Sequence, residues 1–554
     1  MRKMIPTIRF FVNCVVLVLF ALIILQSSVN AEQQNVLKQQ LQSTENSKLM
    51  IGQSEIALAD FVRDTYQYNQ YKLLWQKKSL VKTLLKAINE SDQQGLVPGD
   101  YHLTELTTRL KKGLKQSDIQ EAQLDILLTD AVLRLSYHLT FGKVVPAHLD
   151  ADWNLRRDFL TKDPVAKINY ILQSDTRLKK FLKQSINIGP FYQGLIKALA
   201  QYRQIQQAGG WQSVPSGATI KPGMTDSRMP QITARLYATG DLKKTTINPA
   251  AHIYDASIEA GVKHFQQRHN IDADGLIGKA TLEMMNIPVA QRIDQIRANL
   301  ERIRWVKQNI EEEFVLVNIA GFKVYYVKDN KLVWSSRAQV GKEYRKTPIF
   351  RSDINYLVFN PSWTVPPTIL HEDVLPEIKR DRGYLKKKNM SVLDFKGNII
   401  NPENINWSSI SAKGFPYMIR QDPGPANALG RIKIMFPNKH LVYLHDTPSK
   451  ANFKKTERAF SSGCIRIENP FELVELLLKD SKQWNQARFK EILDSGKLQN
   501  VNLPQTVPVL LLYFTAHLNE DGEVLFFKDI YKRDEKIIEG LIQPFQFAMP
   551  NNKS

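Results

Sequence analysis

The sequence predicts a multidomain α+β protein, with helices over its N-terminal part and a mainly β domain toward its C-terminus. Its 554 residues suffice for about three or four domains of ordinary size, and a hydrophobic share of 43% allows each domain a core. Apolar side chains recur every three or four positions as far as about residue 308, as they do in helices. At Phe314 the spacing changes to two, which is typical of strands.

Residues 1–31 have the pattern of an export signal. Three basic residues precede the apolar run 10–25, and small residues follow it up to Ala31, after which cleavage is expected. At sixteen residues, the run is shorter than the stretch of about twenty that a membrane-spanning helix needs. A cleaved signal peptide and an uncleaved anchor in the inner membrane both remain open, and either predicts a periplasmic protein.

A helical domain is expected over residues 32–227. It begins with a polar segment, Gln33–Ser47, which predicts a mobile linker. Its clearest helix runs through leucines spaced by three and four up to Leu139, and Gly142 ends it. Pro215–Thr225 is rich in Gly, Pro, Ser and Thr and predicts a second linker.

A small three-helix module follows at residues 228–290. Ile258, Val262 and Phe265 lie on one helical face, and a turn at Asp272–Gly275 precedes the last short helix. Four side chains of this module could suggest a metal, but their spacing matches no familiar ligand set: His252, His264, His269 and Asp272. We therefore expect no metal, and no nucleotide motif or other cofactor signal is present.

A helix over residues 291–313 is expected to pack back on the helical domain, and the β domain then spans residues 314–535. Strands Phe314–Val327 and Lys331–Val340 should form a hairpin at Asp329-Asn330, because Asp and Asn tolerate positive φ. The domain closes with two further runs around another hairpin, and residues 536–554 are expected to be a tail. The closing runs are Pro508–Leu518 and Val524–Ile530.

An insertion of about residues 369–429 interrupts the β domain. It begins with a helical pattern, becomes rich in Asn, Gly, Pro and Ser, and carries six basic residues among 379–388. An insertion of this length inside a compact fold is typical of a lid or a binding element. The basic run by itself is equally typical of a solvated face.

A histidine and a cysteine carry the chemistry that the sequence predicts. His445 follows an apolar run, and Cys464 follows a Ser-Ser-Gly turn. An imidazole can take the thiol proton, and the thiolate then attacks a carbonyl; a neighbouring imidazolium can lower the thiol pKa. The N–H groups of Gly463 and Cys464 are candidates for the oxyanion hole. Because Asn469-Pro470 is typical of a helix start, Cys464 should lie on a tight loop just ahead of a helix.

The cysteine count supports a reactive role. The chain has two cysteines, Cys14 and Cys464, so loss of the signal would leave Cys464 alone. A single cysteine in an exported protein cannot form an internal disulfide, and is a free thiol in an oxidising compartment.

This signature resembles that of the L,D-transpeptidases, cysteine acyltransferases of the bacterial cell wall. The likeness rests on the histidine, a gap and then Ser-x-Gly-Cys-Ile-Arg, and the residues flanking both resemble the large periplasmic branch. Ser462 stands where the family commonly has a second histidine, so any orienting role of that histidine is absent or replaced. Thr347-Pro348 and Asn360–Pro366 resemble the same branch.

The resemblance extends beyond the β domain. Residues 262–282 resemble a small peptidoglycan-binding module, which either grips the wall or acts as a spacer. Residues 32–227 resemble the family's helical scaffold domain, and the family implies that the insertion is a capping subdomain over the active site.

The resemblance implies a peptidoglycan L,D-transpeptidase that forms 3–3 cross-links. Cys464 would attack the carbonyl of meso-diaminopimelate in a tetrapeptide stem, release D-Ala and form a thioester, which the amine of a second stem then attacks. His445 would act as general base and acid. Substrate-binding roles are expected for Tyr443, Trp363, Ser462, Asp446 and Arg466. Of these, Asp446 could also orient His445 through its backbone carbonyl, and Arg466 could stabilise the thiolate, pair with a substrate carboxylate or form a structural ion pair.

Other functions remain open at this point. A cysteine peptidase or amidase would use the same pair with water as acceptor, and a non-catalytic wall-binding scaffold protein would need neither residue. The acceptor could be a second stem, a lipoprotein or water. The net charge of +20 favours lipid headgroups and wall-peptide carboxylates over nucleic acid in an exported protein. Expected partners are peptidoglycan stem peptides, with penicillin-binding proteins and glycosyltransferases as further candidates.

Overall fold

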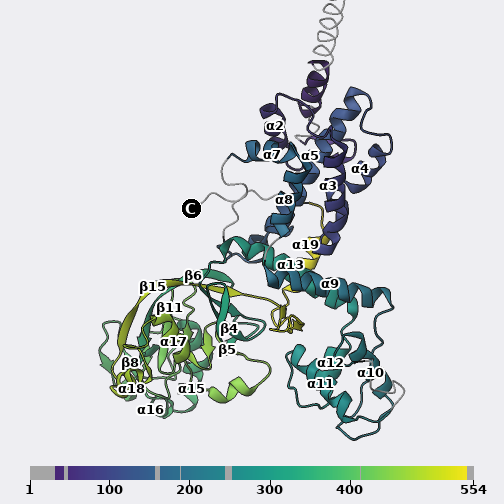
Figure 1. The fold of residues 1–554 in the computed structure, drawn as a ribbon. Coiled ribbons are helices and arrows are strands. Elements are labelled where there is room, and N and C mark those ends of the chain that lie inside the picture. The colour runs from purple at the N-terminus through teal and green to yellow at the C-terminus, as the bar shows by residue number, and fades with distance from the viewer. Residues whose placement is uncertain are drawn as a thin grey trace, which may run out of the picture.

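Figure 1 shows a computed structural model of the chain, which describes residues 31–42, 48–155, 163–186, 189–243, 252–411 and 413–545. The expected export signal lies outside these residues, except for Ala31. Among the helices of the described segments, none combines the length and the apolar character that crossing a membrane requires.

The N-terminal domain packs short helices around one long helix, α5 (Asp118–Phe141), which is buried along most of its length and ends at Gly142 with φ +82°. The expected linker at Gln33–Ser47 is wrong for its first part, because residues 31–42 are helical and bury Leu37 and Leu41. The surrounding elements are β1 (Met50–Ile51), β2 (Ser54–Glu55), α2 (Ala59–Tyr68), α3 (Lys78–Glu90), η1 (Ser91–Gln94), η2 (Pro98–Tyr101), α4 (Leu103–Leu110), α6 (Pro146–Leu149), α7 (Pro164–Leu172), α8 (Asp175–Ile186) and α9 (Pro190–Gln207).

The small module has a hydrophobic core of its own, built by α10 (Met229–Ala238), α11 (Ala256–Arg268) and α12 (Lys279–Met285). The expected linker Pro215–Thr225 is part of this unit, because Ile220 is buried in the core and pairs with Ile277. This Gly- and Pro-rich segment is therefore packed against the module and is not a free linker. Figure 1 shows the module in teal below α9.

Helix α13 (Val289–Val306) joins the parts and, as expected, packs on the helical domain through α9 and α5. It continues into η3 (Lys307–Asn309). The expected C-terminal tail is wrong for its first residues, because α19 (Asp534–Ile542) packs on α13 and buries Ile537 and Leu541. One continuous hydrophobic cluster runs through the helical and β domains.

The β domain is a nine-stranded sheet in the order β13-β5-β14-β12-β11-β6-β15-β3-β4, and β4 pairs again with β5, so the strand order closes on itself. Helices α17 (Pro470–Leu478) and α18 (Gln486–Asp494) follow β14 in the chain. The strands are β3 (Phe314–Asn318), β4 (Lys323–Lys328), β5 (Lys331–Gly341), β6 (Phe350–Phe359), β11 (Ile432–Met435), β12 (Leu444–His445), β13 (Ala459–Ser461), β14 (Ile465–Ile467) and β15 (Gln499–Leu512).

The hairpin expected at Asp329-Asn330 is present, with φ values of +52° and +58°. Three strands are shorter than expected, among them Val524–Ile530, which ends at Phe526. Phe314–Val327 turns at Phe322, which has φ +52°, and forms the pair β3 and β4. Pro508–Leu518 breaks after Leu512 because Asn299 accepts the Thr515 N–H at 2.9 Å, and the chain then forms a separate hairpin of β16 (Ala516–Leu518) and β17 (Val524–Phe526).

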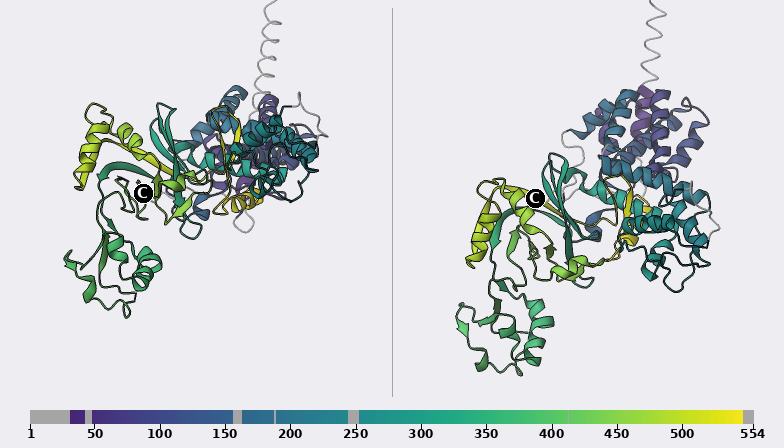
Figure 2. Two further views of the ribbon diagram at one scale, coloured as in Figure 1. Left: turned by 90° about the horizontal axis from the view of Figure 1, so that it is seen from below. Right: turned by 60° about the horizontal axis from the view of Figure 1, so that its bottom comes forward.

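The insertion is a subdomain with its own sheet, in the order β7-β10-β8-β9, and its own hydrophobic core. Figure 2 shows it as a separate lobe projecting from the β domain, and we call it the cap. Its elements are β7 (Trp363–Thr364), α14 (Pro367–Ile369), the π-helical turn η4 (Leu370–Val374), α15 (Leu375–Arg380), α16 (Tyr384–Lys387), β8 (Met390–Leu393), β9 (Ile399–Ile400), η5 (Pro402–Asn404) and β10 (Met418–Gln421).

Candidate active site

Two neighbouring parallel strands bring the expected catalytic residues onto one face. His445 on β12 lies opposite Arg466 on β14, and the Ile465 N–H donates to the Tyr443 carbonyl at 3.1 Å. Because alternate residues of a strand face the same side, Tyr443 and His445 share a face with Cys464 and Arg466. The helix expected to start at Asn469-Pro470 is present as α17, and the three-residue strand β14 lies between it and the loop of Cys464.

The Cys464 thiol is free and only partly buried by its surroundings. Its Sγ lies 3.8 Å from the Leu441 carbonyl oxygen. Burial raises the pKa of the thiol, while hydrogen bonds from Tyr443 and the charges of Lys433 and Arg466 act to lower it. The thiol is therefore protonated at neutral pH and would need a base before it could act as a nucleophile.

His445 is a neutral base in this structure. It is 3% exposed, and burial, followed by the charge of Arg466, lowers its pKa to about 3. Its Nδ1 bonds the Asp446 carbonyl oxygen, which can only accept, so the hydrogen is on Nδ1 and Nε2 keeps its lone pair. Both residues lie in the described chain, yet no hydrogen bond joins His445 to the Cys464 thiol. The expected imidazolium beside a thiolate is thus wrong for the resting site.

The Asp446 side chain points away from this face. Its carboxylate accepts from the Lys450 ammonium at 2.6 Å and from the Arg431 N–H at 2.9 Å. Gly430 lies so close that a Cβ there would meet Asp446 Cγ at 2.5 Å. The carboxylate therefore anchors the loop after β12, and the residue's contact with the site is the carbonyl that holds His445.

Two hydroxyl groups hold the loop around Cys464, one from Ser461 within the loop and one from Thr347 in the segment between β5 and β6. Ser461 Oγ donates to the Cys464 carbonyl and accepts the Gly463 N–H at 3.1 Å. Thr347 Oγ1 donates to the Gly463 carbonyl at 2.8 Å. The Gly463 N–H expected in the oxyanion hole is thus already used, whereas the described chain provides no acceptor for the Cys464 N–H. Gly463 has φ +115°, a conformation that favours glycine.

Ser462 connects the nucleophile loop to the cap through Arg345. Arg345 Nη1 donates to Ser462 Oγ at 2.7 Å and to the Asp373 carboxylate at 2.7 Å, and the guanidinium also pairs with Glu372. Both acids belong to η4 of the cap. Sequence reasoning missed Arg345, although its position two residues before the noted Thr347-Pro348 pair was a usable signal.

Lys433 is the second residue that sequence reasoning missed. It lies opposite His445 on β11, and its Nζ is 3.8 Å from the centre of the Tyr443 ring. Burial lowers the pKa of Lys433 and of Arg466, while the charge of a Cys464 thiolate would raise both. Within the described chain neither cation pairs with a carboxylate. The face therefore carries two unneutralised positive charges beside the thiol.

Trp363 is not brought to this face. It lies on β7 of the cap, pairs with Gln421 and packs against the cap core.

Two of the three histidines of the small module, His264 and His269, have structural partners. His264 bonds Asp241 at 2.9 Å and Glu523 at 3.1 Å. His269 is buried and stacks on Phe265. In the segments that the structure describes, no group of three or more potential metal ligands occurs.

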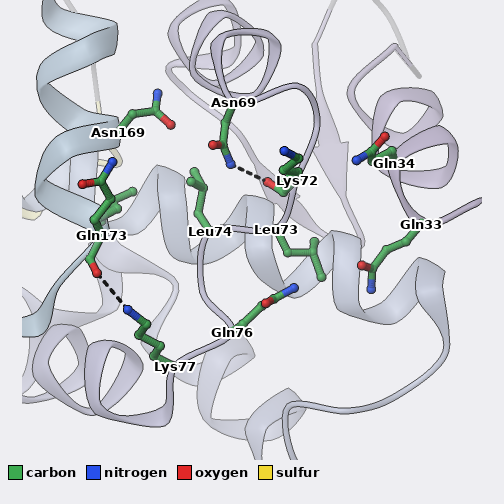
Figure 3. A pocket seen from close by; sticks show the side chains of 11 residues that line it. Gln33, Gln34, Asn69, Lys72, Leu73, Leu74, Gln76, Lys77, Asn169 and Gln173 are labelled. Atoms are coloured by element: carbon green, nitrogen blue, oxygen red, sulfur yellow. Dashed lines mark hydrogen bonds between the residues drawn. The ribbon is translucent and has the colours of Figure 1, made fainter. Parts of the chain in front are cut away.

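The helical domain contains a polar pocket of about 520 Å³. Figure 3 shows that amide side chains and two lysines surround it, and that Lys77 donates to the Gln173 carbonyl. Its lining, among the described residues, contains no Ser, Cys, His, Asp or Glu. This pocket therefore offers no counterpart to the histidine and thiol of the β12–β14 face.

Comparison with protein families matches three segments of the chain. Residues 312–484 match the L,D-transpeptidase catalytic domain (YkuD), residues 60–199 match a scaffold domain, and residues 225–285 match the "Putative peptidoglycan binding domain". The first match contains His445, Cys464 and the whole cap. The observed folds agree, since a mainly β domain and a small helical module occupy these segments.

A curated protein from Haemophilus influenzae, named "Putative L,D-transpeptidase", is 39% identical over 223 residues. The match covers 40% of this chain and 45% of the relative's length, so the chain spans less than half of that protein.

Two solved structures also align weakly. An L,D-transpeptidase from Xylanimonas cellulosilytica is 12% identical, with 54% of this chain and 99% of that chain covered and a TM-score of 0.17. A fused Zn-dependent amidase/peptidase/peptidoglycan-binding domain-containing protein from Clostridium acetobutylicum is 13% identical, with 53% and 99% covered and a TM-score of 0.15. Scores this low carry no argument.

Proposed function

We propose that this chain, whose residues 312–484 match the L,D-transpeptidase catalytic domain, cross-links peptidoglycan stem peptides through a thioester on Cys464. The observation that supports this most is the shared face of β12 and β14, on which a neutral histidine, a free thiol and two unpaired cations meet. We place the enzyme in the periplasm, where its polymer lies.

In the first step His445 Nε2 takes the proton of the Cys464 thiol. Lys433 and Arg466 stabilise the thiolate as it forms, because their charges act to lower the thiol pKa. The hydrogen bond from Nδ1 to the Asp446 carbonyl keeps the correct tautomer and orients the ring. The cysteine and histidine are diagonal neighbours across the two strands, and a bound substrate would have to draw them together.

In the second step the thiolate attacks the carbonyl of the meso-diaminopimelate residue of a tetrapeptide donor. The free N–H of Cys464 stabilises the oxyanion. His445 returns its proton to the leaving amine, D-Ala departs, and a thioester remains on the sulfur. Arg466 and Lys433 also offer charges that a carboxylate of the stem would pair with.

In the third step the side-chain amine of a second stem attacks the thioester. His445 accepts the proton of that amine, the C–S bond breaks, and the product is a 3–3 cross-link with the thiol restored. We further propose that residues 214–287 hold the enzyme on the polymer.

Incubation of the full chain with a disaccharide-tetrapeptide tests this function. Intact-protein mass spectrometry should show an acyl adduct that is absent from Cys464→Ala, and product analysis should show cross-linked dimers. Products consisting of shortened stems alone would instead make the enzyme a peptidase with water as acceptor. No adduct and no product from the wild type would reject the enzymatic function.

A further inference from the structure

A second cavity, of about 330 Å³, lies where the helical domain meets the β domain. Four segments line it: α6 with the loop after it, α13, the loop between β5 and β6, and α19 with the residues just before it. Figure 1 shows α13 and α19 side by side at this junction. We call it the junction cavity; it contains neither Cys464 nor His445.

Positive charge dominates the lining of the junction cavity. Its charged side chains are Asp150, Arg302, Glu343, Lys346, Lys532, Arg533 and Lys536. Three of the five basic groups are paired with carboxylates, because Arg533 pairs with Asp150 at 2.8 Å, Lys532 with Glu343 at 3.3 Å and Arg302 with Asp534 at 2.5 Å. Lys346 and Lys536 have no carboxylate partner in the described chain. The cavity is therefore suited to an anion.

Two buried donors at the junction cavity also have no acceptor. Arg302 is 5% exposed and pairs with Asp534 through Nη1, while its Nη2 has no hydrogen-bond partner. The indole Nε1 of Trp153 is likewise buried and unpaired. Buried donors are normally satisfied, so two such N–H groups at one cavity point to a missing acceptor.

The remaining lining is apolar. Trp153 and Trp305 meet edge to face with ring centres 5.6 Å apart, and Ile349 and Ile537 add aliphatic surface. The unpaired guanidinium Nη2 of Arg302 can donate to a carboxylate oxygen. A doubly charged phosphate would lose more hydration against these rings than a singly charged carboxylate would.

We propose that the junction cavity binds a small carboxylate with a short apolar body, namely an amino acid or the carboxyl end of a peptide. The cavity volume is at the lower end of ordinary ligand sites, which excludes a whole stem peptide. If the proposed function holds, the D-Ala that the enzyme releases and the D-Ala end of a stem both have this chemistry.

The junction cavity also adjoins the nucleophile loop. Lys346 contributes its side chain to the cavity, and its carbonyl oxygen faces the backbone of Gly463. The next residue, Thr347, bonds the Gly463 carbonyl and also Tyr531, another lining residue. A ligand in the cavity would therefore lie directly behind the loop that carries Cys464.

The test uses the full chain with ¹⁵N-labelled tryptophan indoles, titrated with D-alanine and with N-acetyl-D-alanine. Trp153→Phe keeps an aromatic ring and assigns the Trp153 signal by its loss. We expect a saturable shift of that signal with at least one of the acids, and none with N-acetyl-D-alanine methyl ester or inorganic phosphate. A response to D-alanine alone identifies a free amino acid as the ligand, and a response to the N-acetyl acid alone identifies a peptide end.

The double variant Lys346→Ala/Lys536→Ala should weaken binding about tenfold. Lys528→Ala, which removes an exposed lysine outside the cavity, should leave binding unchanged. Arg302→Lys, checked by its melting temperature, should weaken binding further because the free guanidinium N–H is lost. The Trp153 shift should persist in Cys464→Ala, so a failure of the proposed chemistry is distinguishable from a failure of this site. An ester or phosphate response equal to that of the acid, or no saturable shift, overturns the proposal.

Discussion

Arg345 donates to Ser462 Oγ at 2.7 Å, and the same guanidinium holds two carboxylates of η4 in the cap. One side chain thus connects the loop of Cys464 to the lobe expected to cover it. Ser462 stands where the family signature has a second histidine, and the arginine supplies the hydrogen bond that the serine uses.

Loss of the bonds that Arg345 makes to Ser462 and to the cap should impair turnover without unfolding the protein. We expect Arg345→Ala to lower kcat/KM on a soluble stem peptide about tenfold, which corresponds to about 1.4 kcal/mol of lost positioning. Arg380→Ala is the matched control, because it removes an exposed cap arginine whose partner is Glu377 on the same helix. Equal activity of the two variants would show that the bonds of Arg345 do not position the loop of Cys464.

Cys464 should be the site of acylation by carbapenems. The thiolate next to a carbonyl-binding loop should open a strained cyclic amide, and we expect a carbapenem adduct to form faster than any penicillin adduct. Intact-protein mass spectrometry over time should show the adduct on the wild type, none on Cys464→Ala, and greatly slowed formation on His445→Ala. An adduct on Cys464→Ala would place the reactive centre elsewhere.

The reactivity of the thiol should keep rising at alkaline pH. Burial raises the pKa of Cys464, so alkylation by iodoacetamide should still increase above the ordinary thiol pKa of about 8.5. Lys433→Met removes a charge that acts to lower this pKa, and should slow alkylation severalfold at pH 8. Lys528→Met, which changes an exposed lysine, should behave as the wild type does. A profile that reaches its plateau below pH 7 would contradict the raised pKa.

His517 should make the fold sensitive to mild acid. Burial lowers its pKa to about 4, whereas an unfolded histidine titrates near 6.5. The unfolded state therefore binds more protons as the pH falls from about 6.5 to 4, and stability is lost by up to about 3 kcal/mol. His517→Phe can keep the contacts with Phe191 and Tyr325 and should flatten the decline in melting temperature. His148→Gln, at an exposed position, should retain the wild-type decline.

The small module should anchor the enzyme on its polymer. Because Ile220 is part of the module core, the deletion must remove residues 214–287 rather than the helices alone. We expect the shortened chain to sediment poorly with purified sacculi and still to turn over a soluble stem. Unchanged sedimentation would make the module a spacer.

Much of the site was predictable because its chemistry is local in the sequence. The pattern around His445 and Cys464 is short, and the Asp446 carbonyl lies one residue from the histidine, so each is visible along the chain. Lys433 and Arg345 were not predictable in this way. Each reaches the site through strand pairing or through the cap, and a lone lysine or arginine has no distinctive spacing.

The fold departs from prediction where tertiary contacts override local patterns. The run Pro508–Leu518 has uniform β character, yet the strand ends within it. The Asn299 side chain, from helix α13, accepts the backbone N–H of Thr515, which is then not available for strand pairing. Residues 31–42 are mostly polar, so the sequence did not indicate that Leu37 and Leu41 are buried in the core. In both cases the partner lies far along the chain, where periodicity carries no information.

Because its strand order closes, the nine-stranded sheet has few free edges through which copies of the protein could aggregate at high concentration. An open sheet exposes unpaired N–H and C=O groups that can recruit strands of other molecules. Here β4 returns to β5, and within the described sheet the terminal strand is β13, which has three residues. At high local concentration, neighbouring copies would therefore find little free backbone of this sheet to pair with, which disfavours growth into fibrous aggregates.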